Sequence, residues 1–105
     1  NPTMISVAEL NAMLGNKDFT LINVHIPYEG EIPGTDARIP YNEIEKQASR
    51  LPQDKNAKIV VYCRSGPMSA AASKTLVGMG YTRVFDVQGG MDAWQAAGYA
   101  LLNNP

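Results

Sequence analysis

Hydrophobic and polar positions along the chain follow two periods, one typical of buried strands and one typical of helices. Apolar runs without polar alternation predict strands that are buried on both faces, as in a parallel sheet. Apolar residues that recur every three or four positions predict helices. The strand pattern covers residues 19–24, 37–39, 58–62 and 83–87, and the helix pattern covers residues 7–14, 41–51, 69–80 and 91–97. Strands that alternate with helices predict an α/β domain whose parallel sheet is flanked by helices on both faces.

Turn and capping residues set the limits of several of these elements. Ser6 and Glu9 form a capping box that starts the first helix, and Gly78 with Gly80 ends the third helix. Three prolines and two glycines fall within residues 26–40. They predict a long ordered connection that forms a wall beside any site at the neighbouring strand ends.

The composition is that of one folded domain rather than of a disordered chain. Its 105 residues suffice for a single core, and 45% of them are apolar while 18% are charged. We therefore expect residues 1–105 to form one domain. A net charge of −1 gives no general attraction to nucleic acid or to an anionic membrane. With so little net charge, a small anion would have to be bound by a local site. No apolar run approaches the roughly 18 residues that a membrane span needs.

Cysteine and histidine each occur once, as Cys63 and His25. A single cysteine excludes a disulfide within the chain, and the two residues are too few for a Cys/His zinc cluster. The sequence therefore predicts neither a metal site nor a cofactor. A lone cysteine fits the cytoplasm, and a start without methionine is compatible with an exported mature domain, so the compartment stays open.

Cys63 stands directly after the central strand, where a short loop leads into a helix. In open parallel sheets such loops lie at the carboxyl edge, where ligands bind and helix N-termini present backbone N–H groups. Positive potential from those groups favours thiolate over thiol, which predicts a lowered pKa and a nucleophilic Cys63. A lone cysteine is often an inert buried side chain, but Arg64, Ser65 and Gly66 directly after it favour the reactive role.

Several short motifs extend over nearly the whole chain. They are Leu21-Ile22-Asn23-Val24, Ile32-Pro33-Gly34 through Ile39-Pro40, Cys63-Arg64-Ser65-Gly66, Gly78-Met79-Gly80-Tyr81, and Gly89-Gly90-Met91 with Trp94 and Gly98. In their order and spacing they resemble the single-domain rhodaneses, a family of sulfurtransferases. The resemblance implies a rhodanese-like fold with a central five-stranded parallel sheet, and a reaction in which Cys63 cycles through a persulfide.

The resemblance also implies the substrates and the residues that bind them. Thiosulfate, a polysulfide or a persulfide would donate sulfane sulfur to Cys63, and a thiol, a cyanide-like nucleophile or a protein would accept it. Backbone N–H groups of the loop would surround the charged terminal sulfur. The predicted binding residues are Arg64, Ser65, Gly66, Pro67, Met68 and Ser69, with His25 and Tyr28 in the pocket wall.

Two departures from the family pattern bear on activity. Family loops commonly carry a second arginine at the position of Met68, and Pro67 removes one N–H from the loop. A site without that cation should hold dianionic thiosulfate less firmly, which predicts weak thiosulfate activity or a preference for a persulfide or polysulfide donor. The second departure replaces the usual Asp-Val-Arg by Asn23-Val24-His25, so neutral groups stand where the family has a charged pair.

Three side chains near the site have more than one interpretation. His25 could act as a base for the cysteine or hydrogen-bond within its own loop, and the second role is favoured because a thiolate with a lowered pKa needs no base. Arg64 could reach a donor's sulfonate or pair with a carboxylate such as Glu29 or Asp86. Trp94 is predicted as a core anchor because it belongs to an apolar helical stripe.

Two other functions stand as alternatives to sulfur transfer. Cysteine phosphatases and arsenate reductases occur on related folds, but they use an arginine six positions after the cysteine, where this chain has Ser69. The alternative from another class is a catalytically weak binding or sulfur-sensing module with the same fold. Cys63 argues against that module, because a silent domain has no reason to keep a thiol where it is liable to oxidation.

Overall fold

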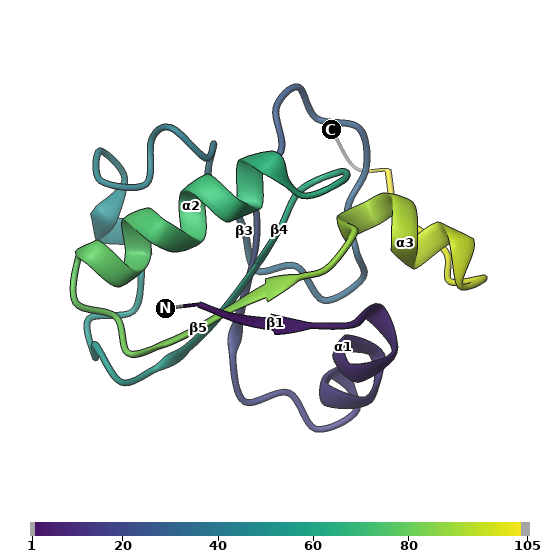
Figure 1. Cartoon of the computed structure of the whole chain (residues 1–105), viewed down its shortest axis with the longest axis horizontal. Coiled ribbons are helices and arrows are strands. Elements are labelled where there is room, and N and C mark those ends of the chain that lie inside the picture. The colour runs from purple at the N-terminus through teal and green to yellow at the C-terminus, as the bar shows by residue number, and fades with distance from the viewer. Residues whose placement is uncertain (1, 104–105) are drawn as a thin grey trace.

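The computed structural model describes residues 2–103, in which strands alternate with helices (Figure 1). The strands are β1 Thr3–Ile5, β2 Thr20–Asn23, β3 Ala37–Arg38, β4 Lys58–Tyr62 and β5 Arg83–Val87. The helices are α1 Val7–Leu14, α2 Pro67–Gly78 and α3 Gly90–Ala96, with a short 3-10 helix η1 at Ala48–Arg50. None of the helices in residues 2–103 has the length and apolar character that a membrane crossing needs.

The strands of the described chain form one parallel sheet of five in the order β1-β5-β4-β2-β3. β4 lies at the centre, and its residues Ile59 to Tyr62 are all buried, as the unbroken apolar run predicts. Parallel pairing brings the carboxyl ends of the strands to one edge of the sheet. Cys63, which follows β4, therefore lies at the same edge as the residues that follow β2 and β5.

Two clusters of buried side chains, one on each face of the sheet, make up the core. On one face α2 packs over β4 and β5 through Ala72 and Leu76. On the other face α1 and α3 contribute Leu10, Met91 and Trp94 (Figure 1). Trp94 is 3% exposed, which confirms its predicted place in the core. The prediction of a parallel sheet with helices on both faces is confirmed as well.

β1 has no counterpart in the hydrophobic pattern. It is three residues long, and only Ile5 is buried. It pairs with β5 at the edge of the sheet, with Thr3 opposite Phe85. A strand this short, with two exposed positions, is too brief to establish a period of two. α2 begins at Pro67, two residues earlier than predicted, because a proline fits the first turn of a helix, where its missing N–H costs nothing.

The helix predicted over residues 41–51 is wrong for most of its length. The segment forms turns, and only η1 is helical. The apolar spacing that suggested a helix arises because Ile44 and Leu51 are both buried in the core. Hydrogen bonds in this segment span three residues more often than four. A chain of turns therefore buries the same two side chains that a helix face would have buried.

The hydroxyl of Tyr62, at the end of β4, joins the sheet to the connection over residues 26–40. It accepts the Ile32 backbone N–H at 3.0 Å and lies 2.7 Å from Thr35 Oγ1. Burial raises the pKa of Tyr62 to about 12. The central strand and the wall of the carboxyl edge are thus connected through one buried phenol.

We expect Tyr62→Phe to lower the free energy of unfolding by about 1–3 kcal/mol, because the buried Ile32 N–H loses its acceptor. Chemical denaturation followed by tryptophan fluorescence measures this change. The control is Tyr41→Phe, which removes a hydroxyl for which the described chain shows no hydrogen bond. A loss below about 0.5 kcal/mol in Tyr62→Phe, equal to that of the control, would contradict the structural role of the hydroxyl.

Candidate active site

The sulfur of Cys63 is enclosed by its own loop. Its side chain is 1% exposed, and Sγ accepts a hydrogen bond from the Gly66 backbone N–H at 3.0 Å. Ser69, in the first turn of α2, places its Oγ 3.5 Å from Sγ and donates to the Gly66 C=O at 3.1 Å. Gly66 has a φ of 144°, which side-chain-bearing residues adopt only with strain. The glycine therefore allows the tight turn that brings an N–H onto the sulfur.

The N-terminus of α3 holds this loop from outside. The Met91 N–H donates to the Cys63 C=O, and the Asp92 N–H donates to the Arg64 C=O, both at 2.9 Å. Gly90 approaches the loop so closely that a Cβ on it would lie 2.3 Å from the Cys63 carbonyl oxygen. Figure 1 shows the loop between β4 and α2 beside the start of α3. The two carbonyls, and with them the peptide planes of the loop, are fixed by this contact.

Arg64 pairs with two carboxylates. Its Nη1 lies 2.8 Å from Glu29 Oε1, and its Nε lies 3.3 Å from Asp92 Oδ1. The hydrogen bonds with Glu29 and Asp92 raise the pKa of Arg64. The pKa of Glu29 is lowered, mainly by its hydrogen bond with Arg64 and next by its hydrogen bond with His25. Of the roles left open for Arg64, the structure shows the pairing with a carboxylate, and one of its carboxylate partners is Glu29. The other carboxylate considered, Asp86, does not pair with Arg64, and Asp92 takes that place because the start of α3 lies against the loop.

His25 is held within its own loop. Its ring Nε2 lies 3.0 Å from Glu29 Oε1, and its backbone N–H donates to Asn23 Oδ1 at 3.0 Å. Asn23 is 2% exposed and also donates its side-chain amide to the Gly30 C=O at 3.0 Å. A neutral amide and an imidazole thus brace the end of β2 and connect it, through Glu29, to Arg64.

A cavity of about 140 Å³ opens over the cysteine. Its lining residues are His25, Cys63, Arg64, Ser65, Pro67 and Met68. Gly66 and Ser69 contact the sulfur itself, so the structure brings the predicted loop residues and His25 together. Tyr28 is not in this lining. Its hydroxyl donates to Glu31 Oε1 at 3.0 Å, and its ring centre lies 4.4 Å from the guanidinium carbon of Arg38.

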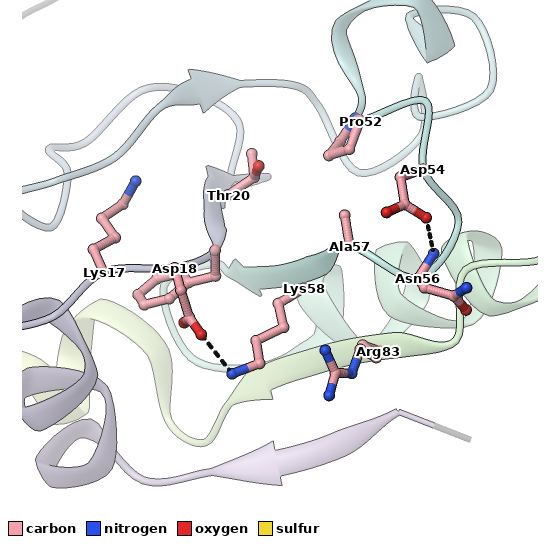
Figure 2. Close-up of a pocket in the computed structure, with 10 residues that line it drawn as sticks. Lys17, Asp18, Thr20, Pro52, Asp54, Asn56, Ala57, Lys58 and Arg83 are labelled. Atoms are coloured by element: carbon pink, nitrogen blue, oxygen red, sulfur yellow. Dashed lines mark hydrogen bonds and ion pairs between the residues drawn. The ribbon is translucent and has the colours of Figure 1, made fainter.

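A larger hollow, of about 560 Å³, lies at the opposite edge of the sheet (Figure 2). Its lining residues are Lys17, Asp18, Phe19, Thr20, Pro52, Asp54, Asn56, Ala57, Lys58 and Arg83. Lys58 pairs with Asp18 at 2.8 Å, and Lys17 pairs with Asp36 at 2.7 Å. This lining contains neither a cysteine nor a histidine, and both lysines are already paired with carboxylates. The smaller cavity over the cysteine is therefore the candidate active site.

One acidic residue of the site carries no local signal in the sequence. Asp92 pairs with Arg64, but it belongs to α3 and is more than 20 residues from Cys63 along the chain. Only the glycine pair Gly89-Gly90 indicates a close approach of backbone after β5. Asp92 becomes part of the site through the parallel sheet, which brings the ends of β4 and β5 together and with them the start of α3.

The fold and the site together define an α/β protein with a single cysteine held at a helix N-terminus on the carboxyl edge of a parallel sheet. The family model for the rhodanese-like domain matches residues 6–97. The chain therefore belongs to the rhodanese-like family, and the family predicted from the sequence motifs is confirmed.

Individual relatives agree with this assignment. The chain is 34% identical to a sulfurtransferase of Allochromatium vinosum over 82% of this chain and 80% of the relative. It is 30% identical to the thiosulfate sulfurtransferase GlpE of Pseudoalteromonas translucida over 89% of each chain. The crystal structure of a rhodanese-related protein from Thermoplasma volcanium superposes with a TM-score of 0.81 at 31% identity, covering 95% of this chain and 97% of that one. These similarities support sulfur transfer as the general activity.

We expect Gly90→Ala to lower the free energy of unfolding by about 2 kcal/mol or more, because the new Cβ would overlap the Cys63 and Arg64 carbonyl oxygens. The control is Gly80→Ala, since Gly80 also has a positive φ, of 100°, but no atom lies within 4 Å of the added Cβ. Thermal and chemical denaturation of both variants measures the difference. Equal losses would show that the contact between α3 and the loop contributes nothing beyond backbone strain.

Proposed function

We propose that the protein transfers sulfane sulfur and carries it as a persulfide on Cys63. The observation that carries this proposal is the 3.0 Å hydrogen bond from the Gly66 N–H to Cys63 Sγ at the start of α2. A sulfur atom that accepts a backbone N–H at a helix N-terminus is stabilised as an anion, which is the form that attacks sulfur.

The reaction has two steps of thiolate attack on sulfur. In the first step the Cys63 thiolate attacks the outer sulfur of a donor such as thiosulfate. The sulfur–sulfur bond of the donor breaks, sulfite leaves with the electron pair, and Cys63–S–S⁻ remains. In the second step an acceptor such as a thiolate attacks the outer sulfur of this persulfide. The new acceptor–sulfur bond forms as the Cys63 thiolate leaves, which restores the starting state.

Backbone N–H groups would stabilise the terminal sulfur of the persulfide. A trans peptide holds its C=O and N–H on opposite sides. Because α3 binds the carbonyls of Cys63 and Arg64, the N–H groups of Arg64 and Ser65 are turned away from α3 and are available to an anion. Pro67 has no N–H to add. The anion site that we propose is therefore built from the first three peptide groups after the cysteine.

The charges around the cavity favour a polysulfide or persulfide donor over thiosulfate. Arg64 is the cation in the lining, and Glu29 and Asp92 already neutralise it. Met68 supplies an apolar surface where a second arginine would supply charge. A dianion therefore gains little in this cavity, while a chain of neutral sulfur atoms with one terminal charge suits an apolar wall and one group of N–H donors.

The acceptor side is a thiol, a cyanide-like nucleophile or a cysteine of another protein. Arg64 lines the cavity, and its side chain is about half exposed, as is that of Asp92, while Glu29 is exposed to a smaller extent. His25 acts in this proposal by holding Glu29, which in turn orients Arg64, rather than as a base for the thiol. The phosphatase alternative has no support at the sixth position, because Ser69 there donates a hydroxyl and brings no guanidinium to the cavity.

Intact mass after brief incubation with polysulfide or thiosulfate tests the persulfide directly. The unsubstituted chain is expected to gain the mass of one sulfur atom, which a reducing agent removes, and Cys63→Ser is expected to gain none. Polysulfide is expected to load the chain faster than thiosulfate at equal concentration. If no donor adds sulfur, the binding or sensing module becomes the better explanation of the fold.

Met68→Arg is expected to lower the KM for thiosulfate by roughly tenfold or more, because a charge-assisted hydrogen bond contributes about 1.5–3 kcal/mol. Steady-state kinetics with cyanide as the acceptor measures this change. The control is Met4→Arg, which makes the same change in charge at a methionine that is 53% exposed on β1. An unchanged KM in Met68→Arg would show that the missing cation does not determine the choice of donor.

A further inference from the structure

One carboxylate oxygen of Glu29 is shared by two side chains of the candidate active site. Glu29 Oε1 lies 2.8 Å from Arg64 Nη1 and 3.0 Å from His25 Nε2. Arg64 and His25 both line the cavity over Cys63, whereas Glu29 is outside that lining. Glu29 therefore binds, from behind, the two basic side chains that a molecule entering the cavity would meet.

The contact with Glu29 determines which nitrogen of the His25 ring carries a proton. The hydrogen bonds with Arg64 and His25 lower the pKa of Glu29, so its side chain is a carboxylate, which can only accept hydrogen bonds. Nε2 must then be the nitrogen that carries the proton. Among residues 2–103 no group hydrogen-bonds the other ring nitrogen, Nδ1. Nδ1 of the neutral ring therefore keeps a lone pair at which the ring can take up a second proton.

A second proton on His25 changes the net charge beside the cavity. The charged side chains joined to the ring are Glu29 from its own loop, Arg64 from the loop after β4, and Asp92 from α3. One guanidinium and two carboxylates carry a net charge of −1 while the ring is neutral. With the ring protonated, the whole group is neutral. Imidazole is the side chain that ordinarily makes this change between about pH 5 and pH 8.

The other segments around the ring add no charged side chain to the lining of this cavity. α2 contributes Pro67 and Met68, and Cys63 is the remaining titratable group of the lining. The titratable side chains of neighbouring elements that lie outside the lining are Tyr28, Glu31, Arg38, Tyr41, Lys74 and Asp86. Only the ionisation of Cys63 itself must therefore be separated from that of His25 in an experiment.

We propose that His25 controls which donors reach Cys63 according to their charge. With the ring neutral, the excess negative charge beside the cavity disfavours an anion. When Nδ1 takes up a proton from solvent, Nε2 stays bound to Glu29, the excess disappears, and an anion enters more readily. Where the anion is a sulfur donor, the inference rests on the proposed function. It makes thiosulfate a better donor below about pH 6 than at pH 8, relative to an uncharged reagent.

The ratio of two alkylation rates at Cys63 tests this control. Iodoacetate and iodoacetamide react with the same thiolate, but only iodoacetate is negatively charged, so the ratio of their rates cancels the ionisation of Cys63. In the unsubstituted chain the ratio of iodoacetate to iodoacetamide is expected to rise roughly threefold to tenfold as the pH falls from about 8 to about 5.5. The same ratio measured with 2-mercaptoethanol is expected to stay level.

Two substitutions separate the ring from the carboxylate. His25→Gln, whose amide takes up no proton, is expected to keep a low and level ratio. Glu29→Gln removes one negative charge at every pH, and it is expected to raise the ratio at pH 8 to about the value that the unsubstituted chain reaches at about pH 5.5. The control is Asp18→Asn, which makes the same change in charge at the opposite edge of the sheet, where Asp18 pairs with Lys58 at 2.8 Å. A level ratio in the unsubstituted chain, or a rise that persists in His25→Gln, overturns the proposal.

NMR spectroscopy of the one imidazole provides a measurement that needs no reaction at Cys63. In Cys63→Ser the nitrogen resonances of the neutral ring are expected to show the proton on Nε2. Thiosulfate, added at constant ionic strength, is expected to raise the pH at which His25 takes up its second proton, because a proton that favours an anion is favoured by it in turn. A threefold preference corresponds to about half a pH unit. A neutral ring with its proton on Nδ1, or no shift with thiosulfate, also overturns the proposal.

Neither measurement involves sulfur transfer, so this proposal and the proposed function can fail separately. A ratio that rises at low pH in a chain that gains no sulfur would contradict the proposed function alone. A level ratio in a chain that gains sulfur would contradict the control by His25 alone.

Discussion

The pair of hydrogen bonds from the N-terminus of α3 to the carbonyls of Cys63 and Arg64 is the contact on which the site depends. A loop at the end of a strand has no partner strand to fix its peptide planes. These two bonds fix them from outside, and the absence of a side chain at Gly90 allows the approach. With the carbonyls held, Gly66 completes the turn and brings its N–H onto the sulfur.

The sheet supplies the second constraint, because it determines which residues share the carboxyl edge. β4 lies between β2 and β5, so the loop after β4 lies between the loops that follow those two strands. The β2 side contributes His25 and Glu29, and the β5 side contributes the start of α3. Arg64 bonds to a carboxylate from each side. One exposed side chain thus joins the three segments that surround the cysteine.

The sequence was sufficient for the parts of this structure that are local. The unbroken apolar run of β4, the glycine turn after Cys63 and the capping box at Ser6 each lie within a few residues, so local chemistry determines them. β1 could not be predicted, because its pairing with β5 and not its own pattern makes it a strand. Residues 41–51 show the opposite case, in which a pattern is present but the predicted helix is not. A helical spacing of apolar residues also fits a series of turns that buries the same side chains.

The acidic residue missed at the site is one whose partner is distant in sequence. Asp92 follows Cys63 by more than 20 residues, as does Asp86, which the sequence offered as a partner of Arg64, and the pairing of β4 with β5 brings their two elements beside the central strand. The two aspartates are negative groups near a sulfur that must itself become negative, an arrangement that opposes ionisation unless each charge is neutralised. Asp92 is neutralised by Arg64 outside the cavity. Asp86 has no cation beside it, so the carboxyl can accompany a thiolate at low cost only when it holds a proton.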